Sequence, residues 1–192
     1  MVETIDTKPW AKSPKAADWV RQGLLVLADA GIDAVRVEPL ATKLERTKGS
    51  FYWYFSNRAE LHASMLEMWR QQATRGVITR VERRAERPED KLQCLIDVAM
   101  SDARGARLEA ALRAWASHDV AAAEVVAQVD RERLTYVRDI LTKIGVAPET
   151  ADVRARIIYL MLIGNFVAMS DGGPAADPAH WRELDRLVSE PG

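Results

Sequence analysis

Cysteine is scarce and histidine is scattered in this sequence of 192 residues. The single cysteine, Cys94, forms no internal disulfide and supplies no thiolate pair to a metal site, which indicates an intracellular protein. The three histidines, His62, His118 and His180, match no metal-binding spacing such as H-E-x-x-H. We therefore expect no metal and no other cofactor, and we expect each histidine at the surface or at a helix cap.

The sequence also lacks a strong net charge and a long apolar run. Its formal net charge of -1 excludes a polybasic protein that holds nucleic acid by phosphate attraction alone. The most apolar stretch, residues 157–169, contains Gly164 and Asn165 and is shorter than the roughly 20 residues that a bilayer requires. The N-terminus has no apolar core of the kind that a signal peptide needs. We therefore predict a cytoplasmic protein with no membrane span, and residues 157–169 as a helix buried on most sides.

No segment alternates apolar and polar residues as a strand would, whereas apolar residues recur at helical spacing along the chain. The sequence therefore predicts an all-α protein. Residues 1–12 show no period and are predicted to be a flexible arm. The first helix is expected to begin at Ser13, whose hydroxyl would cap it, and to stop at Gly31 in a left-handed conformation. Later helices are predicted at residues 58–84, 89–102, 105–117, 119–144, 149–170 and 178–189.

A helix-turn-helix pattern occupies residues 36–55. Its first helix tolerates Pro39 only in the first turn, and Thr47 is a good N-cap for the second. In such a unit the first helix braces the second, which lies in a DNA major groove about 12 Å wide. The first 58 residues carry a charge of +2 and the remainder -3, so the charge asymmetry is mild but has the sign that DNA binding requires.

The second helix of this unit has one apolar side and one polar side. Phe51 and Phe55 are four residues apart and can share the buried side. Gly49 has no Cβ and would let the helix approach the sugar-phosphate chain closely. The remaining side chains are spread around the exposed side: Lys48, Ser50, Tyr52, Trp53 and Tyr54. The alternative for these aromatic residues is packing within the small domain, which we adopt for Phe51 and Phe55 and leave open for Trp53.

Residues from Ser13 to about Trp69, above all TKGSFYWYFSNRAELHASML, closely resemble the DNA-binding domain of the TetR family of transcriptional regulators. The shared features are a Lys-Gly pair, aromatic residues that end in Phe, and a basic residue before a leucine-rich helix. The resemblance implies a homodimeric repressor that holds a palindromic operator in double-stranded DNA and is released by a small apolar or amphipathic effector. It also implies a DNA-binding domain at residues 13–58 and a ligand-binding and dimerisation domain at residues 59–192.

The DNA contacts of the family can be placed on matching positions of this chain. The resemblance implies phosphate contacts from Thr47, Lys48, Gly49, Tyr52 and Arg58, and positions nearer the base edges for Ser50, Trp53 and Tyr54. Arg36 and Thr42 are further candidates.

The turn departs from the family pattern. Glu45 and Arg46 replace the usual glycine and small apolar residue. A glutamate in a left-handed conformation is sterically strained, and its charge would lie close to phosphates. Arg46 would either contact a phosphate or pair with Glu45 in solvent, and the sequence leaves both open.

The C-terminal part is less diagnostic, and its candidate residues come from helical pattern alone. Two of the last helices could form a four-helix interface with a second copy through Ile157, Leu160, Met161, Gly164, Trp181, Leu184 and Val188. An apolar cavity with a few polar contacts could be lined by Met65, Met68, Trp69, Met100, Trp115, His118, Tyr136, Asn165 and Phe166. The alternative for the methionine and tryptophan residues is ordinary core packing.

Two other functions compete with a DNA-binding regulator. The first is a dimeric ligand-sensing module of TetR type whose altered turn has weakened DNA binding. The second is an enzyme built on a helical bundle, but the sequence contains no Gly-rich phosphate loop and no G-x-S-x-G motif. We therefore expect no catalytic residues.

Overall fold

The computed structural model describes residues 13–170, 172–173 and 176–189, and within them it contains helices and no strand. The all-α prediction is therefore confirmed, whereas the predicted N-terminal arm lies outside the described residues. The α-helices, in chain order, are α2 (Pro14–Ala30), α3 (Val37–Lys43), α4 (Lys48–Phe51), α5 (Arg58–Arg70), α6 (Val77–Arg84), α7 (Pro88–Met100), α8 (Ala103–Ala116), α9 (Val120–Ile144), α10 (Pro148–Ser170) and α11 (Pro178–Ser189). A short 3-10 helix, Ile32–Ala34, lies between α2 and α3.

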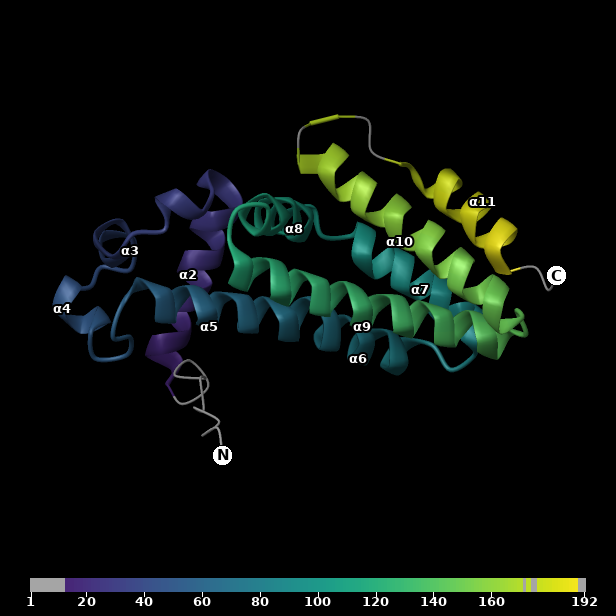
Figure 1. Ribbon diagram of the computed structural model, residues 1–192, viewed down its shortest axis with the longest axis horizontal. Coiled ribbons are helices and arrows are strands. Elements are labelled where there is room, and N and C mark those ends of the chain that lie inside the picture. Colours follow the sequence, from purple (N-terminus) through teal and green to yellow (C-terminus); the bar gives the residue numbers. More distant parts are fainter. Residues whose placement is uncertain (1–12, 171, 174–175, 190–192) are drawn as a thin grey trace.

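The molecule is elongated, with α3 and α4 at one end of its long axis and α11 near the other (Figure 1). Helices α5 and α9 lie side by side along this axis, and α10 packs on both α8 and α9. Helix α2 packs on α5 and α8, so the N-terminal helices are joined to the body by direct contact. The predicted helix bounds agree with those observed to within two residues from α7 onward.

Helices α2 to α4 surround a small aromatic core. The rings of Trp19 and Phe51 meet edge to face with centroids 5.3 Å apart, and Phe51 stacks on Phe55 at 5.2 Å. Trp19 and Phe51 are fully buried and Phe55 is 1% exposed, which confirms the predicted inward side of the second short helix. Ser13 occupies the N-cap position of α2 with an extended backbone, as predicted. Its hydroxyl, however, makes no cap hydrogen bond, so that part of the prediction was wrong. Gly31 ends α2 with a positive φ of 77° but an extended ψ of 175°, outside the left-handed helical region.

The turn between α3 and α4 adopts the strained conformation that the sequence predicts. Glu45 has a φ of 53° and is the only residue other than glycine with a positive φ among the described residues. Arg46 does not pair with Glu45. Its guanidinium donates to the carboxylate of Asp18 on α2 at 2.7 Å and to the carbonyl of Lys15 at 3.0 Å. The turn is therefore held against the start of α2.

The predicted helix at residues 58–84 is continuous, but its hydrogen-bond pattern changes in the middle. Helix α5 passes into a π-helical segment, Gln71–Gly76, and then into α6. A π-helical turn opens the hydrogen-bond pattern from i, i+4 to i, i+5, and such turns occur frequently at functional sites. Thr74 of this segment is buried, although its side-chain oxygen has no hydrogen-bond partner.

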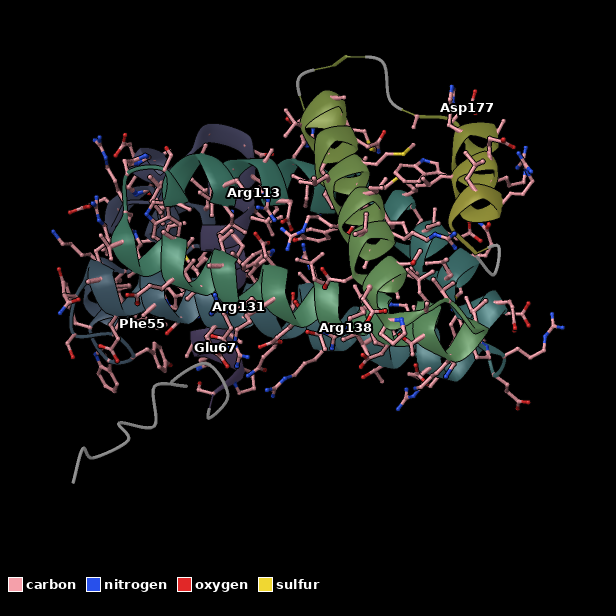
Figure 2. All side chains as sticks on the ribbon, turned by 45° about the vertical axis from the view of Figure 1, so that its right-hand side comes forward. Phe55, Glu67, Arg113, Arg131, Arg138 and Asp177 are labelled. Atoms are coloured by element: carbon pink, nitrogen blue, oxygen red, sulfur yellow. The ribbon has the colours of Figure 1, made fainter. Side chains whose placement is uncertain are left out.

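The body is centred on four charged side chains and one tyrosine from α8, α9 and α10, which we call the ionic cluster: Glu109, Arg113, Asp130, Arg133 and Tyr159. Glu109 accepts hydrogen bonds from both arginines, at 2.9 Å from Arg113 and 3.0 Å from Arg133. Asp130 accepts from Arg113 and from the Tyr159 hydroxyl, each at 2.6 Å. Figure 2 labels Arg113 where these three helices meet. Two positive and two negative side chains thus neutralise each other, with Glu109 buried and Arg113 and Asp130 partly exposed.

Helix α10 is apolar on two sides. Its inner side buries Ala151, Ala155, Ile158, Tyr159 and Phe166 against the body. Its outer side exposes Val153, Ile157, Leu160, Gly164 and Val167. The prediction that residues 157–169 are buried on most sides was therefore wrong, and Gly164 does not interrupt the helix. By length and composition alone α10 could cross a membrane, but its inner side carries the Tyr159 hydroxyl that belongs to the ionic cluster.

Helix α11 packs on α7 with the side that the sequence analysis assigned to a dimer interface. Trp181 is 3% exposed and Leu184 is 9% exposed, and both belong to a core with Leu92, Ile96 and Ile140. Their place in an interface was therefore predicted wrongly. The side chain of Val188 lies outside the described residues.

We expect Glu45→Gly to raise the free energy of unfolding by about 1 kcal/mol, because glycine adopts a positive φ without a Cβ clash. Glu45→Ala removes the same charge but keeps the Cβ, so it should change stability much less. Urea denaturation followed by circular dichroism measures both. Equal stabilisation by the two variants would show that charge, and not backbone strain, is the cost at this position.

Candidate nucleic-acid interface and effector cavity

One end of the molecule presents a short exposed unit formed by α3, α4 and the start of α5. Thr47 caps α4, since its side-chain oxygen accepts from the Ser50 amide at 3.2 Å, which confirms the predicted N-cap. Helix α4 is only four residues long and is followed by a turn that ends before Phe55. Phe51 and Phe55 are both buried, whereas Tyr52 and Trp53 between them project outward.

The largest exposed side chains of this unit are aromatic. Trp53 is 86% exposed and Tyr52 is 53% exposed, so neither serves to pack the protein interior. Tyr54, in contrast, is half-buried and packs on the aromatic core. The packing alternative is therefore wrong for Trp53 and correct in part for Tyr54.

Lys48 and Glu38 form an exposed ion pair across the two short helices. The hydrogen bond from Lys48 holds the pKa of the Glu38 carboxyl below its usual range and raises the pKa of the lysine. Lys48 is therefore fully charged, and its ammonium is already held on the outer side of the unit. A phosphate that binds Lys48 has to compete with the Glu38 carboxylate.

The other predicted DNA-contacting residues lie on the same end of the chain. Arg36, Thr42, Thr47, Gly49 and Arg58 are exposed, and Ser50 is half-buried. Two of these side chains bond to nearby backbone: Arg36 donates to the carbonyl of Asp33 at 2.9 Å, and Thr42 donates to that of Glu38 at 3.1 Å.

Gly49 has free space around the position that a Cβ would take. The nearest atom to such a Cβ is the Thr47 hydroxyl oxygen at 3.8 Å, which is an ordinary contact distance. The backbone at Gly49 is also helical, with no positive φ. Nothing within the chain therefore requires glycine at this position.

Sequence reasoning missed Lys15, which lies beside the unit. A small hollow between the start of α2 and α4 is lined by Lys15, Glu45, Arg46, Thr47, Ser50 and Tyr54. Arg46 donates a hydrogen bond to the backbone carbonyl of Lys15 and so holds Lys15 beside the hollow, although the two residues are 31 positions apart in the sequence. A contact so distant in sequence has no local signal that could have revealed it.

The body contains a cavity of about 270 Å³ between the π-helical segment and helices α6 to α10. Of the nine residues predicted to line a cavity, three do so: Trp69, Tyr136 and Phe166. The guanidinium of Arg133 lies 5.6 Å from the centre of the Trp69 ring. The sequence analysis missed the polar residues Thr74, Glu109, Arg133 and Tyr159 on this wall.

The other six predicted lining residues do not reach the cavity. Met65, Met68 and Trp115 belong to the core that joins α2, α5 and α8. Asn165 donates to the Met100 sulfur at 3.1 Å and accepts from the Ala176 amide at 2.7 Å. These two hydrogen bonds join α10 to the end of α7 and to the segment that precedes α11. His118 is exposed in the turn between α8 and α9.

The three histidines differ in their surroundings. His62 on α5 is half-buried, with its ring edge to face against Trp115 at 5.2 Å, so its placement at the surface was wrong. Burial and the nearby charge of Arg58 lower the pKa of His62 to about 4, and its ring is neutral at pH 7. His180 accepts from the Asp177 amide at the start of α11 and acts as a cap, as predicted.

Comparison with known proteins agrees with this arrangement. Residues 21–65 match the family described as bacterial regulatory proteins, tetR family. No curated protein matches the chain by sequence.

Solved structures share the fold over nearly the whole chain. A transcriptional regulator from Rhodococcus sp. Rha1 is 20% identical with a TM-score of 0.68, and the match covers 91% of each chain. A putative TetR-family transcriptional regulator from Rhodococcus sp. is 15% identical with a TM-score of 0.68, covering 92% of this chain and 96% of that one. BioQ bound to its natural double-stranded DNA operator is 19% identical with a TM-score of 0.51, covering 91% of this chain and 97% of that one. Residues 21–65 therefore match the tetR family of bacterial regulatory proteins, and the chain as a whole shares the fold of these solved structures.

Proposed function

We propose that the protein is a ligand-responsive transcriptional repressor that binds a palindromic operator as a homodimer in the cytoplasm. Residues 13–58 would form the DNA-binding domain, with the helix-turn-helix at 36–55, and residues 59–192 the ligand-binding and dimerisation domain. The observation that carries the proposal is the two-sided α4 unit. Phe51 and Phe55 anchor it to the core, while Lys48, Tyr52 and Trp53 project into solvent.

Gly49 supports a close approach of the DNA sugar-phosphate backbone to α4. The chain itself leaves room for a side chain there, so a requirement for glycine would come from a partner that approaches closely. Lys48 supplies a charged donor for phosphate oxygens, and the cap of α4 leaves amide groups near its exposed start. Thr47, Tyr52 and Arg58 are proposed as further phosphate contacts, with Ser50, Trp53 and Tyr54 nearer the bases.

The outer side of α10 supports a homodimer. Its exposed apolar residues follow a spacing of four, three, four and three, which is the pattern of a helix seam in a coiled coil or bundle: Val153, Ile157, Leu160, Gly164 and Val167. Leu187 of α11 is also an exposed apolar residue. A two-fold dimer would suit half-sites roughly 34 to 36 Å apart in the operator.

Helix α5 offers a physical connection between the cavity and the DNA-binding surface. It begins at the exposed Arg58, and its continuation through the π-helical segment contributes Gln72, Ala73 and Thr74 to the cavity wall. An effector in the cavity would shift α5 and change the separation of the two α4 units in the dimer, so that both no longer fit successive major grooves.

A ligand-sensing module with weakened DNA binding is the second candidate, and the left-handed Glu45 favours it. Its carboxylate lies in the turn of the DNA-binding unit, where it would repel phosphates. This candidate predicts weak operator binding that Glu45→Gly strengthens by a large factor. If the natural protein binds tightly and the reversion changes nothing, the second candidate is excluded. An enzyme is disfavoured because the matching family consists of regulatory proteins.

Lys48→Ala tests the proposed function directly. Fluorescence anisotropy of labelled duplexes, first from the DNA beside the coding sequence and then from a random pool, measures binding at fixed salt with competitor DNA. We expect affinity to fall about tenfold or more, because a phosphate contact within a specific complex is lost. Lys143→Ala on α9 removes one exposed lysine far from this surface and should leave binding unchanged. Failure of the natural protein to enrich any duplex would contradict the proposal.

Gly49→Ala tests whether the glycine is required for DNA binding or for the stability of the fold. Because the chain has room for this Cβ and alanine favours helix, the free energy of unfolding should stay the same or rise by up to about 1 kcal/mol. The affinity for the selected duplex should nevertheless fall about tenfold, since the methyl group would meet the sugar-phosphate chain. A variant that binds as tightly as the natural protein would remove the Gly49 contact from the proposal.

Leu160→Glu tests the dimer interface. Leu160 is 63% exposed in the single chain, so a glutamate should not disturb folding, but its charge would be buried in the proposed interface. Sedimentation velocity should show a dimer for the natural protein and a monomer for this variant. Val120→Glu, at a residue 77% exposed and away from α10, is the matched control and should remain dimeric.

A further inference from the structure

The turn between α3 and α4 ends α3 with a Schellman motif, a helix stop that usually contains glycine. The Arg46 amide donates to the carbonyl of Ala41 at 2.9 Å, and the Glu45 amide donates to that of Thr42 at 3.1 Å. Glu45 holds the position with a positive φ, 53°, where glycine avoids the steric cost of a Cβ. The backbone of this turn is therefore strained, and contacts elsewhere have to offset the strain.

The side chain of Arg46 provides such contacts, and it makes them with α2. In a Schellman motif the residue at this place often packs on the helix that ends, but Arg46 bonds to a different helix. One of its terminal nitrogens donates to Asp18 at 2.7 Å and the other to the carbonyl of Lys15 at 3.0 Å. Two bonds from one planar guanidinium to two residues of α2 fix both the distance and the orientation of the turn.

The Asp18 carboxylate is shared between two arginines. It also accepts from Arg21, three residues further along α2, at 2.7 Å. The hydrogen bond from Arg21 and that from Arg46, opposed by partial burial, hold the pKa of Asp18 below its usual range. The Arg46 side chain is 24% exposed and that of Arg21 is 55% exposed. A phosphate that binds Arg46 would have to displace a carboxylate that is already 2.7 Å away.

The place of Arg46 determines where α4 begins. Thr47, the N-cap of α4, is the next residue, and Lys48 follows it. The other end of α4 is held by Phe51, whose ring meets that of Trp19 on α2. Helix α4 therefore has one anchor on α2 at each end, and loss of the first would leave it free to tilt about the second.

We propose that Arg46 and Asp18 are positioning residues, whose ion pair fixes the start of α4 against α2. The consequence for DNA rests on the proposed function: selection of an operator would depend on this pair. Base contacts require hydrogen-bond distances, whereas contacts with phosphates carry no sequence information. A tilt of α4 would therefore weaken binding to the correct sequence more than binding to any other.

Amide hydrogen exchange of the full chain without DNA tests the position of α4. Asp18→Ala removes the carboxylate, and Arg46→Lys keeps the charge but cannot form both bonds with one planar group. We expect peptides within residues 44–55 to exchange about threefold to tenfold faster in both variants, because a partly exposed charged hydrogen bond is lost. Peptides from α9 should exchange as in the natural protein, which shows that the variants are folded.

Arg21→Ala is the matched control. It removes the other donor to Asp18 but leaves the bonds between Arg46 and α2 in place. Exchange at residues 44–55 should therefore stay as in the natural protein.

Fluorescence anisotropy with the selected duplex and a scrambled duplex of the same composition tests the consequence for DNA. Charge alone predicts that Asp18→Ala binds both duplexes more tightly, since a negative charge is removed near the DNA-binding surface. We expect instead that Asp18→Ala and Arg46→Lys lower the preference for the selected duplex about fivefold or more, as after the loss of one base contact. Arg21→Ala should keep this preference.

Three outcomes overturn the inference. The first is unchanged exchange at residues 44–55 in Asp18→Ala, and the second is an equal effect of Arg21→Ala. The third is tighter binding of both duplexes by Asp18→Ala, which would make Arg46 a phosphate contact that its partner had restrained. If the natural protein prefers no duplex, the proposed function fails, and faster exchange in Asp18→Ala and Arg46→Lys still supports the positioning role.

Discussion

The pairing of Glu109 with Arg113 and Arg133 is the interaction on which the body of the protein depends. Glu109 is 3% exposed, and an ionised carboxylate is strongly unfavourable in the interior without partners of opposite charge or hydrogen-bond donors. Breaking a buried ion pair costs about 3–5 kcal/mol in general. The pairing fixes α8 against α9, and the hydroxyl of Tyr159 extends it to α10. The same arrangement leaves the cavity beside it with a polar but neutral wall.

This cluster also sets the relation between the two ends of the molecule. Arg133 holds the π-helical segment by its bond to the Ala73 carbonyl, and that segment continues α5 toward the DNA-binding end. At that end, Phe51 and Phe55 hold α4 while Arg46 holds the turn against α2. A helix that runs from the wall of a cavity to a surface unit is the kind of element through which two sites influence each other.

Local signals in the sequence were sufficient for most of the fold. Helical spacing predicted the later helices, and Thr47 and the phenylalanine pair predicted how α4 is capped and anchored. The strain at Glu45 could be predicted because it depends only on the residue type and on the position of the residue in the turn. The exposed side of the DNA-binding unit follows from the same period of 3.6 residues.

Contacts between distant residues were beyond that reasoning. The pairing of Arg46 with Asp18 crosses 28 residues, and nothing local distinguishes it from a pair with Glu45. Glu109 and Arg113 have the spacing of an ordinary surface pair on a helix, so their burial required the packing of α9 and α10. Methionine and tryptophan occur in both cores and cavity walls. Met65 and Trp115 were therefore predicted to line a cavity, although they belong to the core. The π-helical segment left no recognisable signal.

We propose that occupation of the cavity and binding of DNA oppose each other. The most direct test uses 2-naphthol, a neutral two-ring probe of a size that suits a cavity of about 270 Å³. A selected duplex is titrated with protein, with and without saturating 2-naphthol, and 2-naphthol is then titrated into the protein with and without the duplex. We expect weaker DNA binding with ligand and, by thermodynamic necessity, weaker ligand binding with DNA by the same factor. Equal DNA affinity in both conditions, with 2-naphthol bound, would contradict it.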